Sequence, residues 1–190
     1  MHRVSFQGIS MMSNILNSIV NAIFNGSFVL LICLSVVKPF KIDIHPTKYN
    51  LLIKSVSYTL LLGSVIYIGS LLRSIYGNIL VGSKDERYSM ISYWFGRYWF
   101  APWLFFFMYA LLPQILWVRK FNQSLVNLTI VVLIWGALSL FIAFTSTHGY
   151  WQVEWKALIM QTLIYLFLLS VMYLILSRRK RQSKPASTNL

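Results

Sequence analysis

A small group of side chains in this 190-residue sequence combines hydrogen-bonding or proton-transfer groups with apolar surroundings. Tyr98 and Trp99 begin one long apolar stretch, and Gln114 and Trp117 lie near its end. His148 follows the next apolar stretch. Amide and indole groups can hydrogen-bond a ligand, aromatic faces pack on apolar molecules, and histidine exchanges protons near neutral pH. The group predicts a site for a lipid-soluble ligand; the alternative is helix packing with interfacial anchoring and a solvated loop histidine.

The cysteine and histidine pattern offers no ligand set for a redox centre. The single cysteine, Cys33, lies inside an apolar stretch, so no intrachain disulfide and no paired-cysteine metal site is available. The histidines, His2, His45 and His148, lie in or beside polar segments. A bis-histidine haem needs two that face each other from apolar helices. We therefore expect this chain alone to bind no metal and no redox cofactor.

The elements that must position these residues are membrane-spanning helices. The sequence is 57% hydrophobic and only 11% charged, whereas a soluble domain is typically about a quarter charged. A span needs roughly 20 apolar residues in a helix. Five stretches qualify: 17–37, 51–72, 98–118, 125–144 and 155–176. We predict an all-α, multi-pass transmembrane bundle over residues 17–177, with an N-terminal segment at 1–16 and a basic, disordered tail at 178–190.

The charges predict an orientation for this bundle. There are 17 Lys and Arg residues against 4 Asp and Glu, a net charge of +13. Five spans sort the basic residues onto two faces, and the more basic face should be cytoplasmic. That places the N-terminus outside and the C-terminus inside. The basic run at 178–181 suits anionic lipid, so we expect membrane lipid rather than nucleic acid as a partner. The cytoplasmic set comprises Lys38, Lys41, Lys48, Lys54, Arg119, Lys120, Arg178, Arg179, Lys180, Arg181 and Lys184. The outer set comprises Arg3, Arg73, Lys84, Arg87, Arg97 and Lys156, with the acids Asp85, Glu86 and Glu154.

The span interiors carry no ionisable residue at their centres. Buried charges usually mark ion or proton paths, so the sequence disfavours a pump, an antiporter, a proton channel or a small transporter. In the third span, Pro113 frees a backbone carbonyl about one turn earlier, which a neighbouring helix must satisfy. The aromatic residues around this span, which include Trp94, Trp103 and 105–107, suit either packing or the wall of a ligand site.

Two clusters of small and polar residues predict close helix–helix contact. The first lies in the first span and comprises Asn21, Asn25, Gly26 and Ser27. The second lies in the fourth span and comprises Trp135, Gly136, Ala137 and Ser139. Between the second and third spans, the outer segment 73–97 is predicted to be a loop with an aromatic-rich amphipathic helix at 88–95.

A series of short motifs gives the chain a resemblance to a known family. In order, they are Ala22-Ile23-Phe24-Asn25-Gly26, Tyr76-Gly77-Asn78, Phe95-Gly96-Arg97-Tyr98-Trp99, Pro113-Gln114-Ile115-Leu116-Trp117, Arg119-Lys120 and Thr145-Ser146-Thr147-His148. With this order and spacing, the chain resembles the C-terminal half of the quinone-interacting membrane subunit of alternative complex III, a quinol:cytochrome c oxidoreductase. That subunit belongs to the NrfD/polysulfide reductase membrane-subunit family. The resemblance covers about residues 21–155.

The departures from that family matter as much as the motifs. The family's subunit is roughly twice as long, and its glutamates are implicated in proton or quinone handling. The corresponding positions here read Ile68-Gly69-Ser70 and Leu138-Ser139-Leu140, without a carboxylate. The resemblance therefore implies the fold and a respiratory setting more than it implies a working site.

The resemblance implies an inner-membrane subunit of a bacterial respiratory quinol oxidoreductase whose redox cofactors are held by other subunits. Quinone is then the expected ligand, at Tyr98, Trp99 and His148 on the outer side or at Gln114 and Trp117 on the inner side. The alternative is a non-catalytic membrane scaffold or assembly protein derived from the same bundle.

Overall fold

The computed structural model describes residues 3–37, 46–97, 99–122, 124–146 and 155–182, and every regular element in these ranges is helical. The α-helices are α1 (Arg3–Val37), α2 (Pro46–Ile75), α3 (Lys84–Phe95), α4 (Phe100–Phe106), α5 (Arg119–Asn122), α6 (Leu125–Ser146) and α7 (Trp155–Gln182). Shorter helical turns are η2 (Tyr76–Val81), η3 (Phe107–Leu111) and η4 (Leu112–Trp117). The chain is an all-α, multi-pass helical bundle, as predicted.

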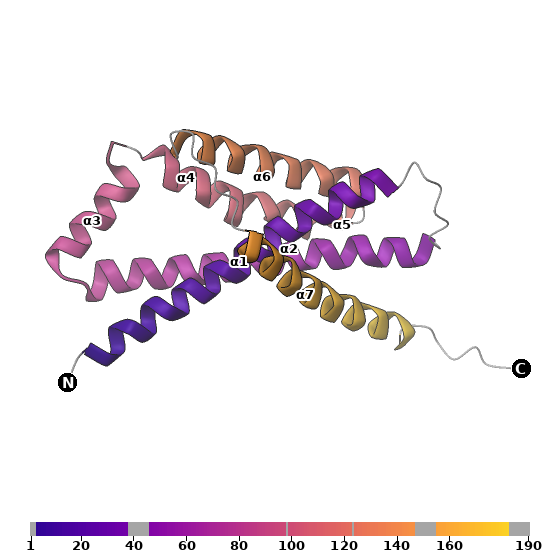
Figure 1. The fold of residues 1–190 in the computed structure, drawn as a ribbon, viewed down its shortest axis with the longest axis horizontal. Coiled ribbons are helices and arrows are strands. Elements are labelled where there is room, and N and C mark those ends of the chain that lie inside the picture. Colours follow the sequence, from indigo (N-terminus) through magenta and orange to yellow (C-terminus); the bar gives the residue numbers. More distant parts are fainter. Residues whose placement is uncertain (1–2, 38–45, 98, 123, 147–154, 183–190) are drawn as a thin grey trace, which may run out of the picture.

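The long helices lie along the molecule, and one short helix crosses its end. In Figure 1, α1, α2, α4 with its extension, and α6 run roughly along the long axis, whereas α3 turns across one end between α2 and α4. Among the described residues, four segments are long and apolar enough to cross a membrane: Ile15–Leu34, Thr47–Val81, Phe100–Trp117 and Ile159–Arg179. The remaining predicted span coincides with α6, a 22-residue helix whose described apolar stretch, Leu125–Ser139, is shorter.

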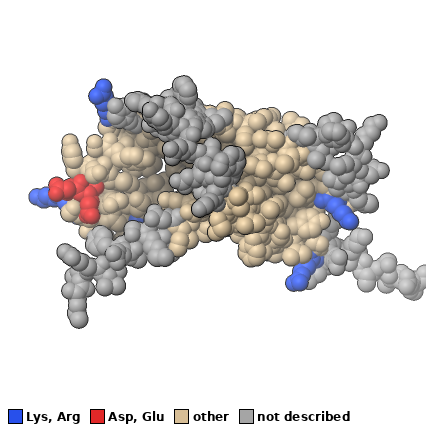
Figure 2. All heavy atoms as spheres, viewed as in Figure 1, with Lys and Arg blue, Asp and Glu red and all other residues tan. Residues whose placement is uncertain are grey.

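On the face shown in Figure 2, the visible charges of the described residues gather at the two ends of the bundle. Figure 2 shows the acidic residues, which belong to α3, beside basic residues at one end, and only basic residues at the other. The described face between them is uncharged. This separation agrees with the two predicted sets. Which set faces the cytoplasm stays a prediction.

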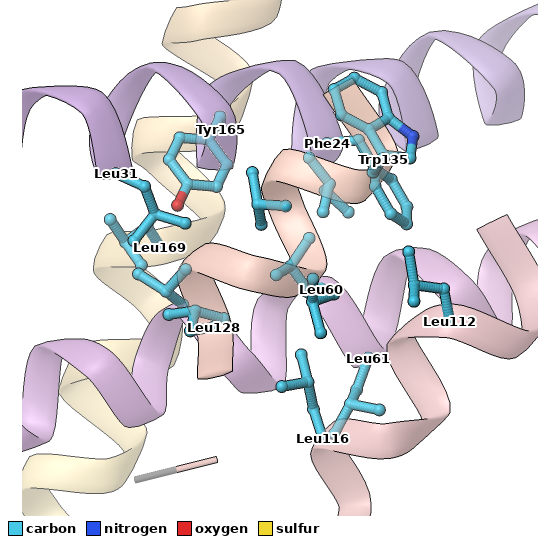
Figure 3. Close-up of a cluster of buried hydrophobic side chains, with 14 of the residues drawn as sticks. Phe24, Leu31, Leu60, Leu61, Leu112, Leu116, Leu128, Trp135, Tyr165 and Leu169 are labelled. Carbon is cyan, nitrogen blue, oxygen red and sulfur yellow. The ribbon is translucent and has the colours of Figure 1, made fainter. Parts of the chain in front are cut away.

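The core lies where six elements meet. Side chains from α1, α2, η3, η4, α6 and α7 form one buried cluster, and Figure 3 shows its centre. The cluster includes Phe24, Leu31, Leu60, Leu61, Leu112, Leu116, Leu128, Trp135, Tyr165 and Leu169. In lipid, such packing replaces the hydrophobic effect as the source of helix association.

Small residues allow α1 to approach its neighbours closely. A Cβ added at Gly26 would collide with the side chain of Tyr165 on α7. A Cβ added at Gly136 on α6 would lie 2.7 Å from the Phe28 ring. Beside Gly26, the Asn25 amide donates to Gln161 on α7 at 2.8 Å. The predicted contact faces are therefore confirmed at these positions.

The other small and polar residues predicted to form helix contacts in the first and fourth spans differ in their exposure. Ser27 is buried, as a contact face requires. Asn21 and Ala137 are exposed, so these two residues stand outside the described helix contacts.

The third predicted span is continuous but changes helix type twice. The α-helix α4 passes into the π-helical η3 and then into the 3-10 helix η4. Pro113 lies at the start of η4, and its ring and missing N–H are incompatible with a regular α-helix at that point. The change of helix type is the local response to this proline, because π and 3-10 turns redirect the backbone hydrogen bonds.

The outer segment 73–97 is more helical than predicted. Instead of a loop, α2 continues to Ile75 and passes into the π-helical η2, where the Asn78 amide donates to the Ser74 carbonyl at 2.9 Å. A capping box then starts α3: the Ser83 N–H donates to Glu86 at 2.6 Å, and the Glu86 N–H donates to the Ser83 hydroxyl at 3.3 Å.

The polar residues of α3 are not arranged as an amphipathic helix requires. Charged residues fill its first turn, at 84–87, and tyrosine, tryptophan and phenylalanine fill its last, at 93–95. Polar and apolar residues therefore separate along the length of α3 rather than between two faces. This corrects the predicted amphipathic helix at 88–95.

The ends of the predicted bundle are also helical where they are described. α1 begins at Arg3, within the predicted N-terminal segment, and α7 continues to Gln182, past the basic run at 178–181. The last residues of the predicted tail, 183–190, lie outside the described residues.

Candidate functional site

The structure describes three of the five predicted site residues. Tyr98 and His148 lie outside the described residues. Trp99 is the N-cap residue of α4, and 57% of its surface is exposed. Gln114 and Trp117 belong to η4, at the far end of the same helical run. The structure therefore separates Gln114 and Trp117 from Trp99 along this helical run.

Gln114 and Trp117 contact each other directly. The Trp117 indole N–H donates to the Gln114 amide oxygen at 2.5 Å. The Gln114 amide nitrogen donates to the Ser64 hydroxyl on α2 at 2.7 Å. Both polar ends of Gln114 are thus bonded within the chain. Of the two roles foreseen for this amide, it fills the one that serves a neighbouring helix.

The backbone before Pro113 is satisfied by the same network. The Ser64 hydroxyl donates to the Ala110 carbonyl at 3.0 Å, three residues before the proline. The prediction that a neighbouring helix satisfies a carbonyl near this position is confirmed. Ser64 itself was not singled out from the sequence. Its signal was a hydroxyl in the middle of an apolar span.

A second site lies at the corner where α3 links α2 to α4. A cavity of about 290 Å³ opens there, and the surface bordering it is entirely apolar. We call it the aromatic pocket. It is lined by Leu71, Ile75, Ile79, Trp94, Phe95, Trp103 and Phe106.

Trp103 organises the aromatic wall of this pocket. Its indole N–H donates to the Trp94 carbonyl at 3.2 Å, which joins α4 to α3. Its ring meets that of Trp94 at 5.4 Å with an interplanar angle of 81°, and those of Phe95 and Phe106 at 6.3 and 6.2 Å. Edge-to-face pairs of this kind add to the energy of apolar burial, so the wall is held in place without a ligand.

Other aromatic residues of the third span pack in the core instead. Tyr109 meets Phe24 at 4.8 Å, Tyr67 at 5.2 Å and Trp135 at 6.0 Å. The sequence predicts either packing or the wall of a ligand site for the aromatic residues of this region. The structure shows both arrangements, because Tyr109 packs in the core whereas Trp103 and Phe106 line the pocket.

The aliphatic wall of the pocket was missed in the sequence. Leu71, Ile75 and Ile79 recur every fourth residue, the spacing of one helix face. The predicted second span ends at residue 72, so Ile75 and Ile79 fall within the predicted loop at 73–97. The unbroken four-residue spacing was the available signal.

No group of three or more His, Cys, Asp and Glu side chains suited to a metal ion occurs among the described residues. Comparison with protein-family models, with curated proteins and with solved structures gives no match. The long apolar helices of the described residues define the class of this chain as an integral, multi-pass membrane protein.

Proposed function

We propose that this chain is an inner-membrane subunit of a bacterial respiratory quinol oxidoreductase, that it holds quinone, and that other subunits carry the redox cofactors. The observation that supports the proposal best is the aromatic pocket. Ligand sites in proteins are concave and mostly apolar, with few polar groups. A pocket of this kind in a membrane bundle suits a ligand that is dissolved in the lipid.

The outer end is favoured over the inner end as the quinone site. At the inner end, the amide of Gln114 is already bonded to Ser64 and Trp117, so its orientation is set by contacts within the chain rather than by a ligand. At the outer end, Trp99 is exposed and lies in sequence between Phe95 and Trp103 of the pocket wall. Tyr98 and His148 are proposed to complete the site, with His148 accepting a quinol proton.

One observation favours a second candidate, a non-catalytic scaffold or assembly protein. Ser64, Gln114 and Trp117 form a closed hydrogen-bond chain that ties η4 to α2. In the membrane, polar residues used in this way act as helix–helix contacts. When the polar side chains of a membrane protein are used for contacts between its own helices, they favour a structural role over a catalytic one.

Isolation from the native membrane separates the two candidates. The affinity-tagged chain is extracted in mild detergent, and the eluate is analysed for c-type haem by absorption, for quinone by extraction, and for partner subunits by mass spectrometry. The proposal predicts haem-bearing and iron–sulfur subunits together with quinone. A scaffold predicts partner subunits without quinone. The chain alone, with neither, would contradict both.

A further inference from the structure

We infer that the aromatic pocket holds one hydrocarbon chain of a membrane lipid, and that the polar head of this lipid stays outside the cavity. The inference goes beyond the proposed function and does not depend on it. An acyl chain of a phospholipid and an isoprenoid tail present the same chemistry to an apolar wall.

The first argument is the chemistry of the lining. All seven side chains that border the pocket are apolar or aromatic, and they present no polar surface to it. A polar head placed inside would lose its hydration and meet no exposed hydrogen-bonding group, since the unpaired indole N–H of Trp94 is itself buried. A hydrocarbon chain incurs no such penalty and gains close contacts with the walls.

The second argument is size. The volume of about 290 Å³ lies just below the range for small-molecule sites, about 300–1,000 Å³. At about 30 Å³ for a group the size of a water molecule, it accommodates on the order of ten such groups. That is a section of one chain rather than a complete lipid.

The third argument is position. The pocket is formed by the last turns of α2, by η2, and by the α3 and α4 helices, and Figure 1 shows α3 crossing the end of the bundle there. The charged first turn of α3 contains Lys84, Asp85, Glu86 and Arg87, and this end of the molecule carries charges of both signs in Figure 2. Charged and aromatic residues together mark the membrane–water interface. If the lipid head lies at this interface, beside α3, its hydrocarbon chain can extend from there into the pocket.

The fourth argument is the stability of the walls. The bond from Trp103 to the Trp94 carbonyl joins two walls directly. The capping box of Ser83 and Glu86 fixes the start of the helix that carries Trp94. The pocket is therefore largely formed before its ligand arrives, as ligand sites usually are.

The test is photolabelling of the full-length chain in phosphatidylcholine vesicles. One arm uses a phosphatidylcholine with a diazirine in its acyl chain, and the other uses an isoprenoid alcohol with a diazirine in its tail. Labelled peptides are mapped by mass spectrometry. Ile75→Trp fills the pocket from α2, and Leu72→Trp is the matched control, because Leu72 belongs to the same helix, is 60% exposed and does not line the pocket.

We expect at least one probe to label the pocket wall at Trp94 and Phe106 more strongly than Phe167 of α7, which is 68% exposed. Ile75→Trp should lower this labelling about tenfold, which corresponds to roughly 1.4 kcal/mol of lost affinity, and Leu72→Trp should leave it unchanged. Leu71→Trp is a second filling variant that serves if Ile75→Trp does not fold. If only the acyl probe labels the pocket, the result supports a pocket for a hydrocarbon chain and counts against the quinone proposal. If the isoprenoid probe labels it, the result supports both.

The inference would be overturned by pocket labelling that is no stronger than the labelling of Phe167, or that neither filling variant reduces.

Discussion

At the scale of single residues, Gln114 has the most consequential role among the predicted site residues. Its amide connects the proline-containing end of the third span to Ser64 on α2. In membranes, interhelical hydrogen bonds contribute about 0.6 kcal/mol on average and up to about 1.7 kcal/mol. The network therefore makes a modest but measurable contribution to the free energy of unfolding of the bundle. Its loss should lower stability, and this is the effect to measure first.

A double-mutant cycle measures this contribution. Gln114→Leu and Ser64→Ala should each lower the free energy of unfolding in detergent, and the double variant should lose less than the sum of the two. The expected coupling is about 1 kcal/mol, since the two residues share one bond. Ser170→Ala is the control, because the Ser170 hydroxyl is exposed and bonds only to the Leu166 carbonyl of its own helix. Strictly additive losses would show that the bond makes no contribution.

At the scale of the elements, the close approach of α1 to α7 depends on Gly26. Gly26→Val should force α7 away from α1, because any side chain at this position overlaps Tyr165. The expected loss of stability is about 1–3 kcal/mol, which is typical of overpacking. Gly69→Val is the control: it lies in α2, and a Cβ at Gly69 has no heavy atom within 4 Å. Thermal unfolding in detergent measures both, and equal losses at the two glycines would contradict the packing described here.

The capping box of α3 gives a second prediction at this scale. Ser83→Ala removes the side-chain acceptor for the Glu86 N–H, and caps of this kind contribute about 1 kcal/mol. Hydrogen exchange should therefore quicken over the first turn of α3 while α2 stays protected. Ser89→Ala, in the exposed middle of the same helix, should leave exchange in the first turn unchanged. Faster exchange in both variants would show that the hydroxyl of Ser83 does not act as a cap.

The sequence predicted the elements better than the details of their ends. Each apolar stretch coincides with a helix, because a segment in lipid must satisfy its backbone internally. The continuation of the second span through η2 was missed, because Arg73 suggested the membrane boundary, whereas the helix continues to the capping box at Ser83. The changes of helix type around Pro113 were also missed, since a proline predicts a local disturbance without specifying which turn replaces the α-helix.

The candidate site was predicted only in part, for a related reason. Tryptophan and glutamine are conspicuous in an apolar sequence, so Trp103 and Gln114 were found. Ile75 and Ile79 are ordinary residues for a membrane helix and become a pocket wall only through their position against α3 and α4. A site built mainly from apolar surface leaves little trace in residue types, because its specificity lies in shape.

At the scale of the whole molecule, the charge distribution predicts an orientation. On the face that Figure 2 shows, acidic and basic residues lie at one end of the bundle and basic residues at the other, and the end with the larger basic set is the one predicted to face the cytoplasm. A reporter active only in the cytoplasm should therefore work when fused to the C-terminus. A matched reporter active only in the periplasm should be silent there. The reverse pattern would overturn the orientation.

The central claim is that the bundle holds a lipid-soluble ligand, quinone, with its isoprenoid tail in the aromatic pocket. It is tested most directly by measuring the quinone retained per chain after purification from native membranes. The comparison is between the unaltered chain, Ile75→Trp, which fills the pocket, and Leu72→Trp, which does not line it. The account predicts that the unaltered chain and Leu72→Trp retain quinone in near-stoichiometric amounts and that Ile75→Trp loses it. No quinone on the unaltered chain, or equal amounts on all three, would contradict the account.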